Sequence, residues 1–408
     1  MKKQVSVEEL QFGVFIAELD RPWTETPFMF QGFILKDDKQ LEVLKQHCKK
    51  VYIDSEKGLD LVDRKLQTGP INTGPRSPSV LDSIKSQTRY EELDSVDAEM
   101  PRARVAQGKT EVALKNMLDS IKAGKAIDAP RVKEAVTSMT DSVVRNPDAM
   151  LLLAKMKEKG DRDLDRAVGV SIYMITFGRF LQLPREQLDL LGMLGLLQDV
   201  GKMRVPEEVL SKRGPLNDAE KALCKGHVEH SVAILKESGG MPAELPALAA
   251  LHHERYDGSG YPKGLKGTQI GLFGVIAGLV DCFDALTHPR PYGEALAPSN
   301  ALSMIYSWRD VQFDAPLIEQ FIQCIGIFPV GAIVELNSGE MGIVIAQNLA
   351  RRLQPRVMVV LDAKGNRKQP QLILDLAKDP KVNPDMPYRI KRTLEKGSVP
   401  IDASEFFA

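Results

Sequence analysis

The sequence predicts a mainly α-helical protein, in which a helical bundle is flanked by a small β-rich N-terminal module and a small β-rich C-terminal tail. Three observations support this fold class. Short β-like runs separated by turn residues occupy positions 4–54. Apolar residues then recur at steps of three and four through the middle of the chain, as they do on one face of a helix. Strand-like runs return after about position 328.

These changes in pattern divide the chain into four parts. We expect the β-rich module over residues 1–60, a linker over 61–104, the helical domain over 105–327 and the β-rich extension over 328–408. The linker is indicated by a stretch rich in Ser, Pro, Gly and charge, which includes TGPINTGPRSPS. A chain of 408 residues is long enough for two or three domains with separate cores.

The two β-rich parts are predicted from short runs of β-branched and apolar residues between turn signals. The N-terminal module should contain strands at 14–17, 28–35 and 51–53, with one helix at 39–49. The C-terminal tail should contain strands at 332–336, 342–346 and 357–361.

The helical domain is predicted from apolar periodicity that begins at about Val105. Residues 188–200 are apolar nearly all round, which is typical of a helix buried inside a bundle. After the first two helical stretches, further helices are expected at 165–182, 186–199, 217–237, 243–253 and 270–286.

Composition and charge exclude several classes of function. The formal net charge is −1, so no overall basic field attracts the protein to a nucleic acid polymer or to anionic lipid. No run of roughly 18 apolar residues predicts a membrane span, and the first residues lack the apolar region of a secretory signal. The four cysteines form no CxxC pair. We therefore expect a cytoplasmic protein without structural disulfides.

Histidines are concentrated in one region of the chain. There are six in all, and five of them fall between positions 227 and 288. Within this region, residues 252–262 read HHERYDGSGYP, where two adjacent imidazoles stand beside acidic residues. Imidazole and carboxylate together suit a transition metal such as iron, manganese or zinc.

Five residues of metal-binding type interrupt consecutive apolar helices of the predicted domain. Such a group inside a helical core must be paired, hydrogen-bonded or bound to a metal. Each of them alone is usually a helix cap or a solvated surface group. That interpretation is weaker for five such residues in consecutive helices of one domain, and it leaves them as candidate ligands: Asp199, His227, His252, His253 and Asp281.

At these residues the sequence resembles a known family. HHERYDGSGYP resembles the HHExxDGxGYP signature of HD-GYP domains, a branch of the HD superfamily. QDVGKMRVPEEVL and VDCFDALTHPRPYG resemble two further motifs of that family, and the matches run in order from about 160 to 325. The opening VSVEELQFGVFIAELDRPWTETPF looks like the small domain that often precedes HD-GYP domains. The resemblance implies a helical HD-superfamily bundle, a centre of two or three metal ions, and hydrolysis of the bacterial messenger cyclic di-GMP.

The resemblance also implies roles for single residues. The five candidate ligands match the family's metal ligands, and Asp199 with Lys202 would be the catalytic pair. Lys202 and Arg290 match a lysine and an arginine that contact the substrate phosphate, which suits an anionic phosphodiester. The expected cofactor is iron or manganese, with one or at most two ions per chain. Loop 258–262 matches a surface implicated in contacts with diguanylate cyclase domains.

Two departures from the family pattern weaken the expected metal centre. Gln198 stands where the family has the His of its HD pair, and Arg166 aligns with a ligand His of an earlier helix. An amide is a poor metal ligand, and a permanently protonated guanidinium is none. We therefore expect one metal position to survive at Asp199, His227, His252 and His253, and the other to be lost.

These departures leave three functions open. The first is a cyclic di-GMP phosphodiesterase of reduced activity. The second is an inactive sensor or adaptor that binds the nucleotide or partner proteins, and the third is a purely structural helical module.

Alternatives also remain for four neighbouring residues. His230 could approach the site or lie on the surface. Glu254 and Asp257 could orient the His pair or cap turns. Asp284 is expected to hydrogen-bond a ligand His.

Overall fold

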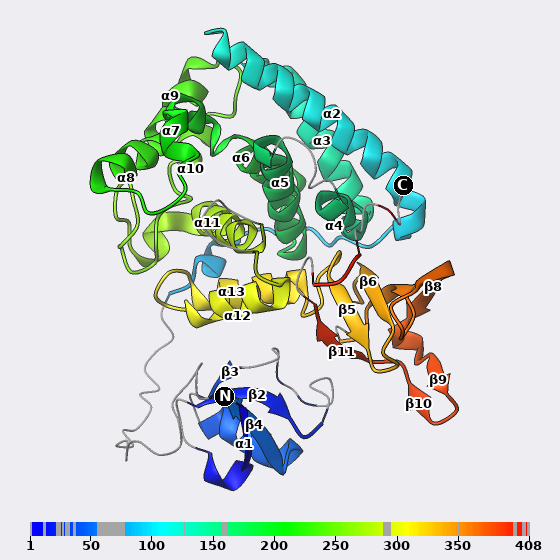
Figure 1. The fold of residues 1–408 in the computed structure, drawn as a ribbon. Helices are drawn as coiled ribbons and strands as arrows, with labels where there is room; N and C mark the ends of the chain where they lie inside the picture. The colour runs from blue at the N-terminus through cyan, green and yellow to red at the C-terminus, as the bar shows by residue number, and fades with distance from the viewer. Residues whose placement is uncertain are drawn as a thin grey trace.

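A helical domain makes up the largest part of the molecule, with one β-sheet before it and one after it in chain order (Figure 1). The computed structural model describes residues 2–10, 14–21, 26, 28, 33–35, 38–54, 78–125, 127–156, 162–288, 295–348, 351, 353–394, 398–401 and 405. The predicted fold class, a mainly α-helical protein flanked by two β-rich parts, is confirmed.

The N-terminal module is an antiparallel sheet with one helix. Strands β1 (Lys2–Ser6), β2 (Phe15–Leu19), β3 (Phe33–Ile34) and β4 (Lys50–Asp54) are ordered β1-β4-β2-β3, and helix α1 spans Asp38–His47. Apolar side chains of β1, β2 and β4, with Leu44 on α1, form a core of their own. The sequence predicted three of these strands and the helix to within a few residues.

The helical domain begins earlier in the chain than the periodicity predicted. Helix α2 (Val96–Lys122) starts at Val96 rather than at about Val105, because the Ser95 side chain accepts a hydrogen bond from Ala98 N and so caps the helix. Helices α3 (Ala129–Arg145) and α4 (Pro147–Met156) follow and pack against α2.

Two helices form the centre of the bundle. Helix α5 (Arg162–Phe180) packs along α6 (Arg185–Leu197), and α6 is buried nearly all round, as predicted. At Gly195 a side chain would meet the Ser171 backbone at 2.5 Å, so the absence of a Cβ lets the two helices approach closely. Helix α6 ends at the segment that carries Asp199, which is followed by a short 3-10 helix, η4 (Val200–Arg204).

Two predicted helices are corrected by the structure. The helix expected at 217–237 is two helices, α8 (Asp218–Lys225) and α9 (His227–Glu237), separated at Gly226. Glycine is a weak helix former. The helix expected at 243–253 is the short α10 (Leu245–Ala249), so the His pair lies in the turn after it and not at its end.

The remaining helices complete the domain. They are α7 (Glu207–Leu210), α11 (Gly271–Thr287), α12 (Pro298–Ser307) and α13 (Ala315–Ile325). Among the described residues, one segment, Gly267–Thr287, is long and apolar enough by length and composition to cross a membrane. Of its most apolar window 72% is buried inside the structure, and buried core helices meet the same criteria, so it is weak evidence for a span.

The C-terminal part is an antiparallel sheet of five strands in the order β11-β5-β6-β7-β8, with a small hairpin formed by β9 and β10. Its inner face has a separate apolar core, and β6 also packs against α4. The strands are β5 (Ile333–Leu336), β6 (Met341–Ala346), β7 (Arg356–Leu361), β8 (Arg367–Asp375), β9 (Lys381–Asn383), β10 (Met386–Pro387) and β11 (Ile390–Thr393).

Candidate metal centre

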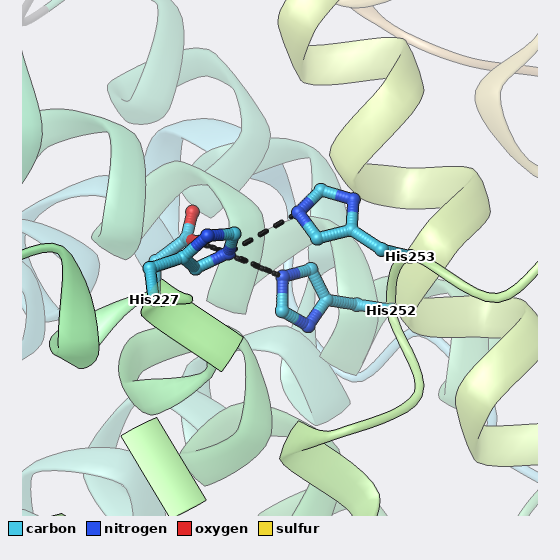
Figure 2. A group of neighbouring side chains, drawn as sticks. His227, His252 and His253 are labelled. Atoms are coloured by element: carbon cyan, nitrogen blue, oxygen red, sulfur yellow. Dashed lines mark hydrogen bonds and ion pairs between the residues drawn. The ribbon is translucent and has the colours of Figure 1, made fainter. Parts of the chain in front are cut away.

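Four of the five predicted ligands lie together in the structure. One ligand atom from each of Asp199, His227, His252 and His253 lies within 4.8 Å of the others. Figure 2 shows the three imidazole rings turned toward one another. His227 Nε2 is 3.3 Å from His252 Nε2, 3.2 Å from His253 Nε2 and 3.2 Å from Asp199 Oδ1.

A close contact between two backbone segments brings Asp199 to His227. A side chain on Gly201 would lie 2.1 Å from His227 O and 2.3 Å from Ser231 N, so only glycine fits here. Gly201 N donates a hydrogen bond to Ser231 Oγ at 2.8 Å, which fixes η4 against α9. Asp199 follows α6 directly, and His227 is the first residue of α9.

Hydrogen bonds to the backbone set the orientation of two ligand rings. His227 Nδ1 lies 2.6 Å from Cys224 O, and His252 Nδ1 lies 2.8 Å from Ala249 O. A carbonyl oxygen only accepts, so each Nδ1 carries the proton, and in the neutral ring Nε2 carries the lone pair. Both Nε2 atoms therefore present lone pairs to the centre of the cluster, which is the tautomer that a metal ligand needs.

The charge state of Asp199 also suits a cation. Burial alone would raise the pKa of Asp199, but the Lys202 ammonium and, after the two neighbouring imidazoles, Arg166 hold that pKa well below its usual value. Its Oδ1 is buried and has no hydrogen-bond partner among the described residues. An ionised oxygen facing two imidazole lone pairs is repelled by them unless a cation lies between. The donor set fits a divalent metal ion.

His253 is held by an aromatic ring from the loop that follows it. The Tyr261 ring stacks on the His253 ring with centroids 4.6 Å apart and planes 22° apart. Burial, with the neighbouring His252, lowers the pKa of His253, so this ring is neutral and able to bind a metal. The Lys225 ammonium lies 4.9 Å from the centroid of the Tyr261 ring. The sequence reasoning missed both contacts, although Lys225 stands only two positions before His227.

The fifth predicted ligand, Asp281, is not part of the cluster. Its Oδ1 accepts a hydrogen bond from Arg166 Nη2 at 2.7 Å, and Arg166 Nε donates to Asp284 Oδ2 at 2.9 Å. Burial alone would lower the pKa of Arg166, but the carboxylates around it, Asp281 first, raise it. The guanidinium of Arg166 is therefore permanently charged. It pairs with Asp281, the carboxylate that was expected to bind metal.

Gln198, next to Asp199, adds no ligand atom to the group of four. Its side chain is buried, and its Oε1 has no hydrogen-bond partner in the described part of the chain. The sequence had assigned this position, with Arg166, to a lost metal position.

The contacts of Glu254 and Asp257 favour a role in the local structure of the loop. Glu254 accepts hydrogen bonds from Lys263 N and Leu265 N at 2.8 and 2.9 Å, and so anchors the loop. Asp257 accepts one from Ser259 N, as a turn cap does.

Two expectations about other polar residues are settled by their contacts. The expectation that Asp284 hydrogen-bonds a ligand His is wrong, since it pairs with Arg166 and His288. His230 lies outside the cluster.

Of the two residues predicted to contact the substrate phosphate, the structure describes Lys202. Lys202 Nζ donates to Asp199 Oδ2 at 2.6 Å, and 30% of its side chain is exposed. Arg290 lies outside the described residues.

Comparisons with known proteins match three successive stretches of the chain. The family described as HD domain matches residues 148–317, a domain of unknown function matches residues 2–132, and a KOW domain associated with HD domain matches residues 333–389. A cyclic di-GMP phosphodiesterase of Pseudomonas aeruginosa is 32% identical over 93% of this chain and 90% of its own length. A cyclic di-GMP phosphodiesterase response regulator of Xanthomonas campestris is 36% identical over 42% of this chain and 50% of its own length. A solved HDG"Y"P protein of Bdellovibrio bacteriovorus has a TM-score of 0.45 at 14% identity, over 79% of this chain and 98% of that one.

Proposed function

Because this chain belongs to the HD domain family, we propose that it is a metal-dependent phosphodiesterase that hydrolyses cyclic di-GMP at a centre with one surviving metal position. Relatives named as cyclic di-GMP phosphodiesterases support the substrate. The observation that carries the proposal is the convergence of four ligand atoms within 4.8 Å. The residues proposed to hold the ion are Asp199, His227, His252 and His253.

Three imidazoles and one carboxylate suit a first-row transition metal, and we propose iron or manganese. When bound, such an ion supplies Lewis-acid chemistry, since it polarises a phosphoryl oxygen and makes water a stronger nucleophile. The protein's own part is to hold three neutral rings and one ionised carboxylate in place. The backbone carbonyls of Cys224 and Ala249 do this for His227 and His252.

Lys202 is the proposed phosphate-binding group of the centre. Its partly exposed ammonium lies beside Asp199 and can turn toward a phosphate oxygen, where it would offset negative charge that develops during cleavage. Arg290 is proposed for the same role by its place in the sequence, because a guanidinium can grip a phosphate with two hydrogen bonds.

Reduced activity follows from the state of Arg166. Two metal ions stabilise both the attacking and the leaving oxygen of a phosphodiester, and a single ion does less. Arg166 occupies Asp281 and Asp284, so those carboxylates are not free to hold a second ion. The same observation favours a second candidate function, in which the domain binds cyclic di-GMP without cleaving it and acts as a sensor or adaptor.

Two further proposals concern the surroundings of the protein. The four cysteines form no disulfide bond in the structure, which supports a location in the cytoplasm. The loop that follows the His pair is anchored by Glu254, and its residues Asp257, Ser259 and Pro262 are exposed. This rigid exposed loop is the surface that we propose for contacts with diguanylate cyclase domains.

The test is a metal and turnover measurement on the full chain. Purified protein loaded with Mn²⁺ or Fe²⁺ is expected to retain about one ion per chain and to convert cyclic di-GMP slowly into a linear dinucleotide. His253→Ala should lose the ion and all turnover, because it removes one of four ligands.

His230→Ala is the matched control, since His230 lies on α9 outside the ligand group. Full metal content in His253→Ala would show that the ion is held elsewhere. Nucleotide binding without any turnover in the wild-type protein would select the sensor.

A further inference from the structure

Lys225 lies at the edge of the metal centre without belonging to it. Its ammonium is 4.9 Å from the centroid of the Tyr261 ring, and that ring stacks on the ligand His253 at 4.6 Å. Lys225 is the last residue of α8, and the ligand His227 is the first residue of α9. Lys225 is therefore connected to the ligand His253 through the Tyr261 ring, and it lies two positions before the ligand His227.

The charge of Lys225 is not used by a protein partner in the described part of the chain, where it forms no ion pair. Lys202, the other lysine of the centre, is already paired with Asp199 at 2.6 Å. Lys221, one turn earlier on α8, pairs with Asp218 at 3.0 Å. The contact of Lys225 with an aromatic face leaves its ammonium hydrated and accessible, because the side chain is exposed.

The proposed substrate brings two separate negative charges to the centre, one on each of its phosphodiester groups. Lys202, which is proposed to bind phosphate, is paired with Asp199, and the guanidinium of Arg166 is paired with Asp281 and Asp284. Of Lys202, Arg166 and Lys225, only Lys225 has no carboxylate partner among the described residues.

We propose that the Lys225 ammonium binds the second phosphate of the cyclic dinucleotide, the one that is not cleaved, while the first phosphate lies at the four-ligand centre. This inference rests on the proposed function. The four-carbon stem of lysine gives the ammonium the reach to leave the Tyr261 ring for a phosphate oxygen. Lys225 would thereby favour a ligand with two phosphates over one with a single phosphate.

The experiment compares two ligands on metal-loaded full-length protein by isothermal titration calorimetry. Cyclic di-GMP carries both phosphates, and GMP carries only one. In Lys225→Ala the dissociation constant for cyclic di-GMP should rise about tenfold relative to that for GMP, as expected for the loss of one charge-assisted contact. Lys225→Arg should restore the ratio, and Lys221→Ala is the matched control on the same helix.

The slope of affinity against salt gives a second readout. Loss of one phosphate contact should make the binding of cyclic di-GMP less dependent on salt in Lys225→Ala, whereas Lys221→Ala should keep the wild-type slope. Equal weakening of both ligands would mean that Lys225 acts through the metal ligands, and it would overturn the inference.

The failure of this inference is distinct from the failure of the proposed function. If wild-type protein binds cyclic di-GMP and Lys225→Ala binds it equally well, the inference alone is wrong. If the metal-loaded wild-type protein binds no cyclic di-GMP, the proposed function is wrong, and this inference with it.

Discussion

Arg166 is the residue whose predicted effect on the metal centre can be compared directly with its contacts in the structure. Alignment with a family histidine predicted that a fixed positive charge would replace a metal ligand at this position. In the structure the guanidinium donates to Asp281 and Asp284. The pairing of Asp281 with Arg166 could not have been predicted from the sequence alone, because the two residues are 115 positions apart and the packing of α5 against α11 brings them together.

Removing this guanidinium and restoring the missing imidazole should rebuild the second metal position. The double variant Gln198→His with Arg166→His is expected to raise the metal content from about one to about two ions per chain and to raise any phosphodiesterase rate, since it frees Asp281 and supplies two ligands. Inductively coupled plasma mass spectrometry gives the count.

Each single variant serves as a control, because one added imidazole leaves the second position incomplete. If the double variant holds no more metal than the wild-type protein, our assignment of these two positions is wrong.

At the level of elements, the centre depends on how segments end and how closely they approach. The sequence predicted most of the helices, but it merged α8 with α9 and extended α10 to the His pair. Apolar periodicity does not report where a helix stops when the next residues remain apolar. The breaks at Gly226 and after Ala249 are what place Cys224 O and Ala249 O within reach of the two imidazoles.

A methyl group at Gly201 should separate η4 from α9 and disrupt the centre. The added Cβ of Gly201→Ala would lie 2.1 Å from His227 O, which is backbone and cannot rotate away. We expect the free energy of unfolding to fall by about 3 kcal/mol and metal binding to weaken, measured by urea denaturation and metal titration.

Gly239→Ala is the matched control, because no atom lies within 4 Å of its added Cβ. Wild-type stability and full metal content in Gly201→Ala would contradict the close approach described for these two segments.

On the scale of the whole molecule, a buried carboxyl joins the helical domain to the C-terminal sheet. Asp148 of α4 accepts a hydrogen bond from Gln347 N, just after β6, at 2.8 Å. Gln347 also donates through its side chain to Phe328 O. Burial raises the pKa of Asp148 to about 7, although the Gln347 N–H opposes the shift. The joint therefore responds to pH near neutrality.

The contribution of Asp148 to the free energy of unfolding should fall as the pH rises from about 4 to about 7. In the unfolded chain an aspartate titrates near pH ~3.9, so the folded state binds more protons between about pH 4 and pH 7 and is favoured at the acid end. In Asp148→Asn this dependence is absent, so the variant should gain stability relative to wild type between pH 5 and pH 8, by at most about 1.4 kcal/mol per pH unit. Urea denaturation at the two pH values measures the gain.

Asp119→Asn, at an exposed position on α2, is the control. Its free energy of unfolding should differ from that of the wild type by the same amount at both pH values. A constant difference between Asp148→Asn and wild type would refute the proposed titration.

The order of the β-rich and helical parts could be predicted from the sequence, because the periodicity of apolar residues within each segment determines it. The three-part order and most long helices follow from periodicity, while α4, α12, α13 and β8 were missed. β8 contains a proline and is mostly exposed, so it lacks the alternation that marks a strand. β11 pairs with β5 across more than fifty residues, a choice made by tertiary packing rather than by its own four residues.

The backbone bonds of the two ligand rings bear on when the protein acquires its metal during biosynthesis. Each bond runs from a ring to a carbonyl three residues earlier, at the end of α8 or in the last turn of α10. Those carbonyls take up their positions only when the helices have formed. In an unfolded chain these histidines have no fixed tautomer, so we expect a metal ion to bind tightly only after the two helices have formed.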